Sequence, residues 1–400
     1  MPTLSRMSSR NSSADAGFRT ILDRLVIGLL LAAVLLTAWI GSDYVRHPPS
    51  TWNSRMTTTN HNNNHGPAIP ADAMAACLIL FDDNLSLTEW LAYHYHVMPL
   101  RHVIVLTDPR STESPVPILE RWSGFLTYEL WEESRVFAHD PERLQELRAA
   151  GDLVQLHRAR QGHFYGQCMK ELKERGKHND HDQWLVLTDV DEYITINPRV
   201  AEQSHKLYRP HQTFNLTESG SVLTFLQQEK KEPPACLHMA RRDMVSKESS
   251  LEKINAGVPD FLDATAFFTT RWRHQSQRRI TGKALVNLAA IRYTDIPIQT
   301  PRQGHVPLQR YCPSWRAKYR YDMENTPLVV HHYLGTQAQY QHRDEGRRDR
   351  TDAGFENKQN QPTTVQDSVR SWLAGFVESV GRERAAQLLA GAGHLGVDER

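Results

Sequence analysis

Residues 184 to 194, Trp-Leu-Val-Leu-Thr-Asp-Val-Asp-Glu-Tyr-Ile, indicate how this chain folds. The first five residues are apolar and rich in β-formers, which predicts a buried strand near the centre of a sheet. Three carboxylates follow within four positions, Asp189, Asp191 and Glu192. On an extended segment Asp189 and Asp191 point the same way, because side-chain direction repeats every two residues. One hard divalent cation, Mn²⁺ or Mg²⁺, could then bind both through oxygen. A solvated turn is the alternative interpretation.

Two earlier apolar runs, residues 75–81 and 101–107, also predict strands that end in acidic residues. Asp83 follows the first run and Asp108 follows the second. Helical spacing predicts a helix after the first run, with Ser86 or Thr88 as its N-cap.

A second helix is expected at residues 116–122 and another strand at 126–131. Strands that alternate with helices predict an α/β fold with a doubly wound sheet. Ligands of such sheets collect outside the carboxyl ends of the strands, so the acidic residues at the three strand ends are candidates for one site.

The composition is that of a large globular domain with appendages: 400 residues, 40% apolar, with a formal net charge of +1. A charge so close to zero offers no basic excess that would favour nucleic acid as a partner.

The N-terminal region predicts a membrane anchor. Residues 25–41 carry no charge and are dense in Leu, Val, Ile and Ala, which suits a spanning helix. A cleaved signal peptide is disfavoured, because bulky residues stand where small ones are needed. Arginines are more frequent in residues 1–24 than just after the segment, which predicts a cytoplasmic tail and a single-pass type II protein. The rest of the chain would then lie in the lumen of the Golgi or the ER.

Beyond this anchor we expect three regions. Residues 42–74 are polar and of low complexity, which predicts a flexible stem. The α/β domain is assigned to residues 75–345, and an amphipathic pattern near residues 365–380 predicts a C-terminal helical extension over 346–400.

Four cysteines lie in the predicted luminal part, where disulfides are permitted. Cys77 and Cys168 fall in strand-like and helix-like runs and are interpreted as buried thiols. Cys236 and Cys312, both near prolines in loop-like segments, are the preferred pair.

Several of these motifs resemble glycosyltransferase family 92 and its neighbours, over about residues 75–345. The most specific are Glu89-Trp90 with His94, Phe164-Tyr165 before Cys168, and the acidic motif at residues 189–193. From the residues alone, Glu89, His94 and Tyr165 are interpreted as packing or capping residues.

The resemblance implies a GT-A fold and a transferase that uses a nucleotide sugar, UDP-linked, and a glycan or glycoconjugate acceptor. It implies that Asp83 and Asp108 contact the base and ribose, while Asp189 and Asp191 hold the metal and the diphosphate. Relatives tend to have Asn-Glu where this chain has Asp83-Asn84, which leaves the base contact open.

A third metal ligand is expected near the C-terminal end of the domain. Residues 328–335 predict a strand that carries His331 and His332, and the resemblance to GT-A transferases favours a metal-binding histidine there. His332 is preferred over His331, and His305 is a weaker alternative.

Two cations and one base complete the predicted site. Arg273 and Lys283, from a basic stretch, are candidates for stabilising the diphosphate. An inverting transferase also needs a carboxylate base. Asp263 is chosen over Glu248 and Asp260, and Asp191 counts as catalytic because it would hold the cation.

Two rival functions stay open. A haloacid-dehalogenase-like phosphatase also has Asp-x-Asp after an apolar strand, with the first aspartate as nucleophile, but its motif usually opens the domain. A membrane-anchored protein that binds carbohydrate without catalysis would not need the acidic motif and His332 together.

Overall fold

A computed structural model describes residues 70, 72–176, 182–197, 216–228, 235–248, 250–275, 282–300, 308, 311, 326–335, 337, 340, 352–359, 363–364 and 369–392. The predicted membrane segment, residues 25–41, and nearly all of the stem lie outside these residues. Among the helices that are described, none combines the length and the apolar character needed to cross a bilayer.

The described chain contains strands and helices in alternation through its first half. The strands are β1 (Met74–Leu80), β2 (Leu100–Thr107), β3 (Thr127–Trp131), β4 (Trp184–Val186), β5 (Glu192–Ile196), β6 (Cys236–Lys247), β7 (Trp272–Gln275), β8 (Lys283–Asn287), β9 (Leu328–Tyr333) and β10 (Thr363–Thr364). The helices are α2 (Asn84–Val97), α3 (Val116–Trp122), α4 (Glu133–Val136), α5 (Pro141–Ala150), α6 (Leu153–Arg175), α8 (Ser221–Gln228), α9 (Leu251–Asn255), α10 (Phe268–Arg271), α12 (Asp352–Gln359), α13 (Trp372–Val380) and α14 (Arg382–Leu388). Short 3₁₀ turns are η1 (Ala264–Ala266), η2 (Leu288–Ala290) and η3 (Tyr293–Asp295).

These strands form one mixed sheet in the order β10-β7-β6-β8-β4-β1-β2-β3. Strands β4, β1, β2 and β3 run parallel, and β8 joins β4 antiparallel. Strand β9 pairs with both β6 and β5, so β5 lies off the main path. The prediction of an α/β fold is confirmed.

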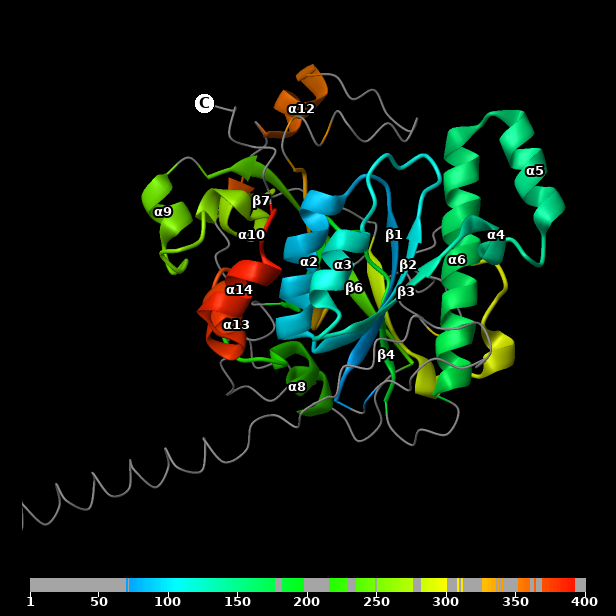
Figure 1. Cartoon of the computed structure of the whole chain (residues 1–400), viewed down its shortest axis with the longest axis horizontal. Coiled ribbons are helices and arrows are strands. Elements are labelled where there is room, and N and C mark those ends of the chain that lie inside the picture. Colours follow the sequence, from blue (N-terminus) through cyan, green and yellow to red (C-terminus); the bar gives the residue numbers. More distant parts are fainter. Residues whose placement is uncertain are drawn as a thin grey trace, which may run out of the picture. The chain divides into compact units, whose positions relative to one another are not determined.

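Helices cover both faces of this sheet. Alternate residues of β1 enter two different hydrophobic clusters, because successive side chains of a strand point to opposite faces. One cluster includes residues of α2, α3 and α13, and the other includes residues of α6. Figure 1 shows α2 and α3 on one side of the strands and α6 on the other. Burial on both faces explains why β1 and β2 are almost continuously apolar.

Helix α2 begins earlier than the sequence predicts. Asp83 is its N-cap residue and makes no capping hydrogen bond through its side chain. Ser86 and Thr88 lie inside the helix and are buried, so the prediction that one of them is the N-cap is wrong. The apolar pattern after residue 86 is real, but it marks the packed part of the helix rather than its start.

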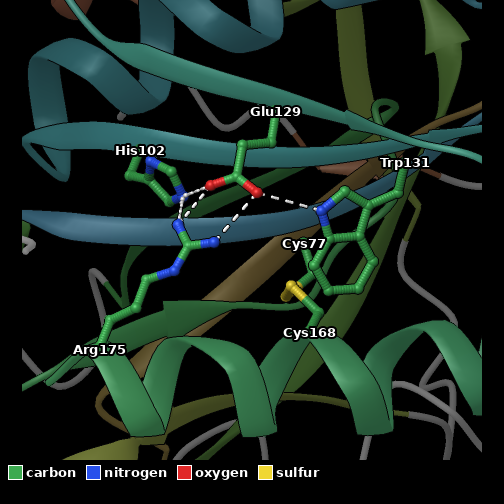
Figure 2. The surroundings of a disulfide bond; sticks show 6 residues. All are labelled: Cys77, His102, Glu129, Trp131, Cys168 and Arg175. Carbon is green, nitrogen blue, oxygen red and sulfur yellow. Dashed lines mark hydrogen bonds and ion pairs between the residues drawn. A yellow bond between two sulfur atoms is a disulfide. The ribbon is translucent and has the colours of Figure 1, made fainter. Parts of the chain in front are cut away.

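Helix α6 is attached to the sheet by a disulfide between Cys77 of β1 and Cys168 (Figure 2). Their Cα atoms are 6.3 Å apart, although 91 residues separate them in sequence. The interpretation of these cysteines as thiols is therefore wrong, because packing α6 on β1 brings the two side chains together. Cys236 is also disulfide-bonded. Its predicted partner, Cys312, lies outside the described residues.

An ionic cluster attaches the C-terminal end of α6 to β3 beside that disulfide (Figure 2). Glu129 of β3 pairs with Arg175 of α6 and accepts a hydrogen bond from Trp131 Nε1 at 3.2 Å. His102 Nε2 of β2 lies 3.6 Å from Glu129 Oε1. Burial lowers the pKa of His102 to about 4.

Helix α13 packs into the same core as α2. Trp372 and Phe376 are fully buried, and the Trp372 ring meets the Tyr93 ring edge-on at 5.5 Å. Gly375 lies against the backbone of Thr217, where a Cβ would come within 2.0 Å of the carbonyl oxygen. The amphipathic pattern near residues 365–380 therefore marks a helix that completes the hydrophobic core.

Candidate metal centre

The acidic motif lies in a turn between β4 and β5. Strand β4 ends at Val186, and the Glu192 N–H donates to the Asp189 carbonyl at 3.1 Å. The prediction that Asp189 and Asp191 share one side of an extended segment is therefore wrong. The Asp189 side chain is 44% exposed, whereas that of Asp191 is 5% exposed.

Three side chains could hold a cation together: Asp191, Glu192 and His332. One ligand atom of each lies within 4.8 Å of the other two. The pairing of strands produces this arrangement, because Glu192 of β5 stands opposite His332 of β9. His332 Nε2 is 3.4 Å from Asp191 Oδ2. Of the two adjacent histidines, His332 belongs to this group, whereas His331 is fully buried on the same strand.

Two basic side chains, Lys283 and Arg241, and one further carboxylate, Asp243, lie beside these three side chains. Lys283 Nζ lies 2.6 Å from Glu192 Oε2 and 3.1 Å from Asp189 Oδ2. Asp243 of β6 stands beside His332 in the parallel pairing, with its Oδ1 3.1 Å from His332 Nδ1. Arg241 Nε is 3.1 Å from the same Asp243 oxygen.

The charge of this group favours a divalent cation. The carboxyl groups of Asp189, Asp191, Glu192 and Asp243 gather around Lys283 and Arg241, so the acidic side chains of this group outnumber these two basic ones. The set of carboxylate oxygens and one imidazole nitrogen suits Mn²⁺ or Mg²⁺.

Burial shifts the pKa values of the charged side chains in this group. Burial raises the pKa of the Glu192 carboxyl; Lys283 opposes this, while Asp189 adds to it. Burial alone would lower the pKa of Arg241, but Asp243 and Glu192 raise it on balance. Glu192 Oε1 is buried and accepts no hydrogen bond from the described residues; Arg241 Nη1 is 3.9 Å from it. A buried carboxylate oxygen without a donor is what a cation would satisfy.

Tyr165 connects α6 to the same group. Burial, then Asp189 and Glu192, raise the pKa of its phenol well above the usual range. Tyr165 lies one turn before Cys168, so the disulfide fixes the part of α6 that carries it. The interpretation of Tyr165 as a packing residue leaves out this proximity to the acidic motif.

The predicted nucleotide residues lie at the carboxyl ends of β1 and β2. Asp83 follows β1 and accepts the Phe81 N–H at 3.1 Å. Asp108 follows β2 and is buried, and both of its oxygens accept hydrogen bonds from Arg110. Arg160 of α6 also pairs with Asp108 and bonds to Glu133. The Asp108 carboxylate is therefore held by arginines of this chain.

The other predicted residues lie outside the acidic group or outside the described side chains. Asp263 is exposed and accepts hydrogen bonds from the N–H and the hydroxyl of Thr265, at the start of η1. Arg273 lies on β7, opposite Ser246 of β6, and its side chain is not described. His305 lies outside the described residues.

Three residues of the group were not selected from the sequence. Glu192 belongs to the quoted motif, but the expectation of an extended strand directed attention to Asp189. Arg241 was seen only as part of a basic stretch, and nothing in the sequence singled out Asp243. A strand pattern across residues 236–247 would have put Arg241 and Asp243 on one face, at a spacing of two.

The residues of α2 that carry the family resemblance lie behind the acidic motif rather than in it. Glu89 is buried and accepts hydrogen bonds from the N–H groups of Phe268 and Thr269 and from the Thr269 hydroxyl. His94 is buried too, and burial lowers its pKa to about 3. Their interpretation as packing residues agrees with these contacts.

The pH dependence of stability should show the state of Glu89. Burial raises the pKa of Glu89 to about 7, against the hydrogen bonds from Thr269 and Phe268. Because this pKa lies above the unfolded value of 4.5, its contribution to stability is complete below pH 4.5 and is lost as the pH rises through 7. The free energy lost by Glu89→Gln should therefore shrink by about 3 kcal/mol between pH 4.5 and pH 8.

Urea unfolding of both proteins across this range would test it. Glu383→Gln, which makes the same chemical change at an exposed position, is the control. A difference between wild type and Glu89→Gln that stays constant with pH would contradict the expectation.

Comparison with known proteins gives weak matches. No family model matches the chain, and no curated protein sequence matches it. Two crystal structures of TarS 1–349 from S. aureus, one of them in complex with UDP, match at 12% and 11% identity. Each match covers 78% of this chain and 74% of that chain, with a TM-score of 0.29. A TM-score this low does not establish a shared topology.

Proposed function

We propose that this chain is a metal-dependent glycosyltransferase. It moves a sugar from a nucleotide sugar, UDP-linked, to a hydroxyl of a glycan or glycoconjugate, with inversion. The observation that carries the proposal is the group of Asp191, Glu192 and His332, whose ligand atoms all lie within 4.8 Å of one another, with further carboxylates beside them. The resemblance of the motifs to glycosyltransferase family 92, with its GT-A fold, supports it.

Each side chain of the group would have its own role in the reaction. A divalent cation bound there supplies a positive charge that offsets the charge gathering on a departing diphosphate. Asp191, Glu192 and His332 would hold it. Lys283 places an ammonium group 2.6 Å from the Glu192 carboxyl and opposes the rise in its pKa that burial causes. Arg241, which is 16% exposed, offers a guanidinium whose planar fork suits phosphate oxygens.

The strand ends nearby suit the remainder of a nucleotide. Asp83 is partly exposed and stays a candidate for the base contact. Asp108 would act through Arg110, because its oxygens already bind that guanidinium. Arg110 is 28% exposed and stacks on the Phe81 ring at 4.6 Å, so its outer face is accessible to a ligand.

The proposal also includes the cellular location of the domain and the general base of the reaction. A membrane anchor at residues 25–41 would place the domain in the Golgi or ER lumen, where UDP sugars and glycan acceptors meet. Asp263 remains the proposed base, with its carboxylate held at the start of η1.

Nucleotide binding should depend on the cation. Without it, a diphosphate would approach a group that already carries a net negative charge. We expect the full-length protein in detergent to bind UDP in calorimetry with Mn²⁺ and to lose most of that affinity in EDTA. Asp191→Asn should behave as wild type does in EDTA. Asp260→Asn, at a side chain that is 83% exposed, is the control.

Equal affinity for UDP with Mn²⁺ and with EDTA would refute the metal dependence. Metal-dependent hydrolysis of a phosphate monoester that Asp189→Asn abolishes would favour the phosphatase instead. UDP binding without transfer or hydrolysis of any UDP sugar would favour a protein that binds carbohydrate without catalysis.

A further inference from the structure

Strand β5 has one edge that no other described strand covers. The odd-numbered residues along β5 form the backbone hydrogen bonds with the β9 side. The Tyr333 N–H donates to the Asp191 carbonyl, and the Asn197 N–H donates to the Pro327 carbonyl, both at 2.8 Å. In an antiparallel pair, every second residue turns its N–H and C=O groups away from the partner, and in β5 these are the even-numbered residues. Glu192 and Ile194 therefore present their backbone groups to the other side.

Side chains of α2 take the place of a strand on that side. Trp90 Nε1 donates to the Glu192 carbonyl at 3.1 Å, and the Tyr93 hydroxyl donates to the Ile194 carbonyl at 2.9 Å. The Ile194 N–H donates to His94 Nε2 at 3.4 Å. All three side chains are fully buried.

The proton on His94 is fixed by the same helix. His94 Nδ1 lies 2.8 Å from the Trp90 carbonyl oxygen, which can only accept a hydrogen bond, so Nδ1 carries the proton. Nε2 is then an acceptor, which is what the Ile194 N–H requires. Trp90 and His94 are one helical turn apart, so both reach β5 from one face of α2.

Glu89, also on α2, attaches this helix to α10. Its carboxylate binds Phe268 and Thr269 at the start of α10, and Thr269 Oγ1 accepts a hydrogen bond from Trp372 Nε1 at 2.9 Å. Helix α2 therefore joins this edge of β5 to α10 and α13 through buried polar contacts. Such contacts hold one register, because each displaced partner would leave a buried group unsatisfied.

We infer that Trp90, Tyr93 and His94 are positioning residues for the cation site. By binding the backbone of Glu192 and Ile194, they fix the strand on which Glu192 faces His332. The inference rests on the metal-dependent function proposed above, and it gives the Glu89-Trp90 and Tyr93-His94 pairs a role that packing alone does not explain. The site depends on their hydrogen bonds because, among the strands that the structure describes, none lies beside Glu192 on that side to hold its backbone.

The test compares a double variant at Trp90 and Tyr93 with a control at another buried tryptophan, in the full-length protein. Trp90→Phe/Tyr93→Phe removes both donors to β5 and keeps aromatic rings in place. Trp122→Phe is the matched control, because Trp122 is also fully buried in this core and its Nε1 makes no hydrogen bond within the described chain. Mn²⁺ affinity is measured by electron paramagnetic resonance, and amide exchange of residues 192–196 by mass spectrometry.

We expect the double variant to bind Mn²⁺ about 10-fold more weakly, as removal of outer partners of metal ligands typically does. Amide exchange in β5 should be faster, while Trp122→Phe should leave both properties near wild type. If the double variant matches Trp122→Phe in Mn²⁺ affinity, the inference is overturned. If the wild type itself binds no Mn²⁺, the proposed function fails, and unchanged exchange in β5 would then also remove the positioning role.

Discussion

Asp191→Asn should leave the protein folded and reduce sugar transfer by several orders of magnitude. The change nearly preserves shape but removes one of the charges that would hold the cation, at a side chain 5% exposed and 3.4 Å from His332. The unliganded free energy of unfolding should be unchanged or slightly higher, because Asp191 stands among carboxylates that repel it. Circular dichroism, thermal melting and a transfer assay on the same preparation measure these effects.

Asp189→Asn is the informative comparison for that variant. The Asp189 side chain is 44% exposed and pairs with Lys283. The Asp189→Asn change should therefore lower Mn²⁺ affinity less than Asp191→Asn does. If Asp191→Asn kept near-normal transfer while Asp189→Asn lost it, the cation site would be misassigned and the phosphatase alternative would return. An insoluble Asp191→Asn protein would mean that the carboxylate has a structural role.

Trp184→Ala should have the opposite profile, with a large loss of stability and little change in chemistry. Trp184 is 2% exposed, begins β4 and belongs to the core cluster of α2 and α13. Its ring is removed from a packed interior, so we expect a loss of about 3–5 kcal/mol in the free energy of unfolding. Urea unfolding measures this, and transfer per folded molecule at low temperature should stay near wild type.

Leu251→Ala, at a side chain 64% exposed, is the control for Trp184→Ala and should change stability little. A Trp184→Ala protein of near-normal stability would contradict the central position of β4. A fully folded variant without activity would instead connect Trp184 to the acidic site.

The local pattern of apolar residues was sufficient to place several elements in the first half of the fold. Strands β1 and β2 and helix α3 were placed to within one residue of their ends. Period-two and period-3.6 patterns are properties of a short window, which is why they survive without knowledge of the rest of the chain. The position of Asp83, Asp108 and Asp189 after parallel strands followed from the same alternation.

Contacts between distant segments could not be predicted in this way. The Cys77–Cys168 disulfide spans 91 residues, and Lys283 meets Asp189 across 94. Neither leaves a periodic signal, because each depends on how helices and strands pack after they form. Asp108 shows the same limit, since its partner Arg160 lies 52 residues away on α6.

The sequence by itself determined that carboxylates gather at the carboxyl ends of parallel strands, and that a histidine follows on a late apolar strand. The tertiary structure decided which of those carboxylates faces the histidine. Residues 189–192 form a turn, and the antiparallel register of β5 with β9 then places Glu192 opposite His332. A shift of one residue in that register would turn the Glu192 side chain to the other face of the strand. The cation site is therefore a consequence of long-range strand pairing.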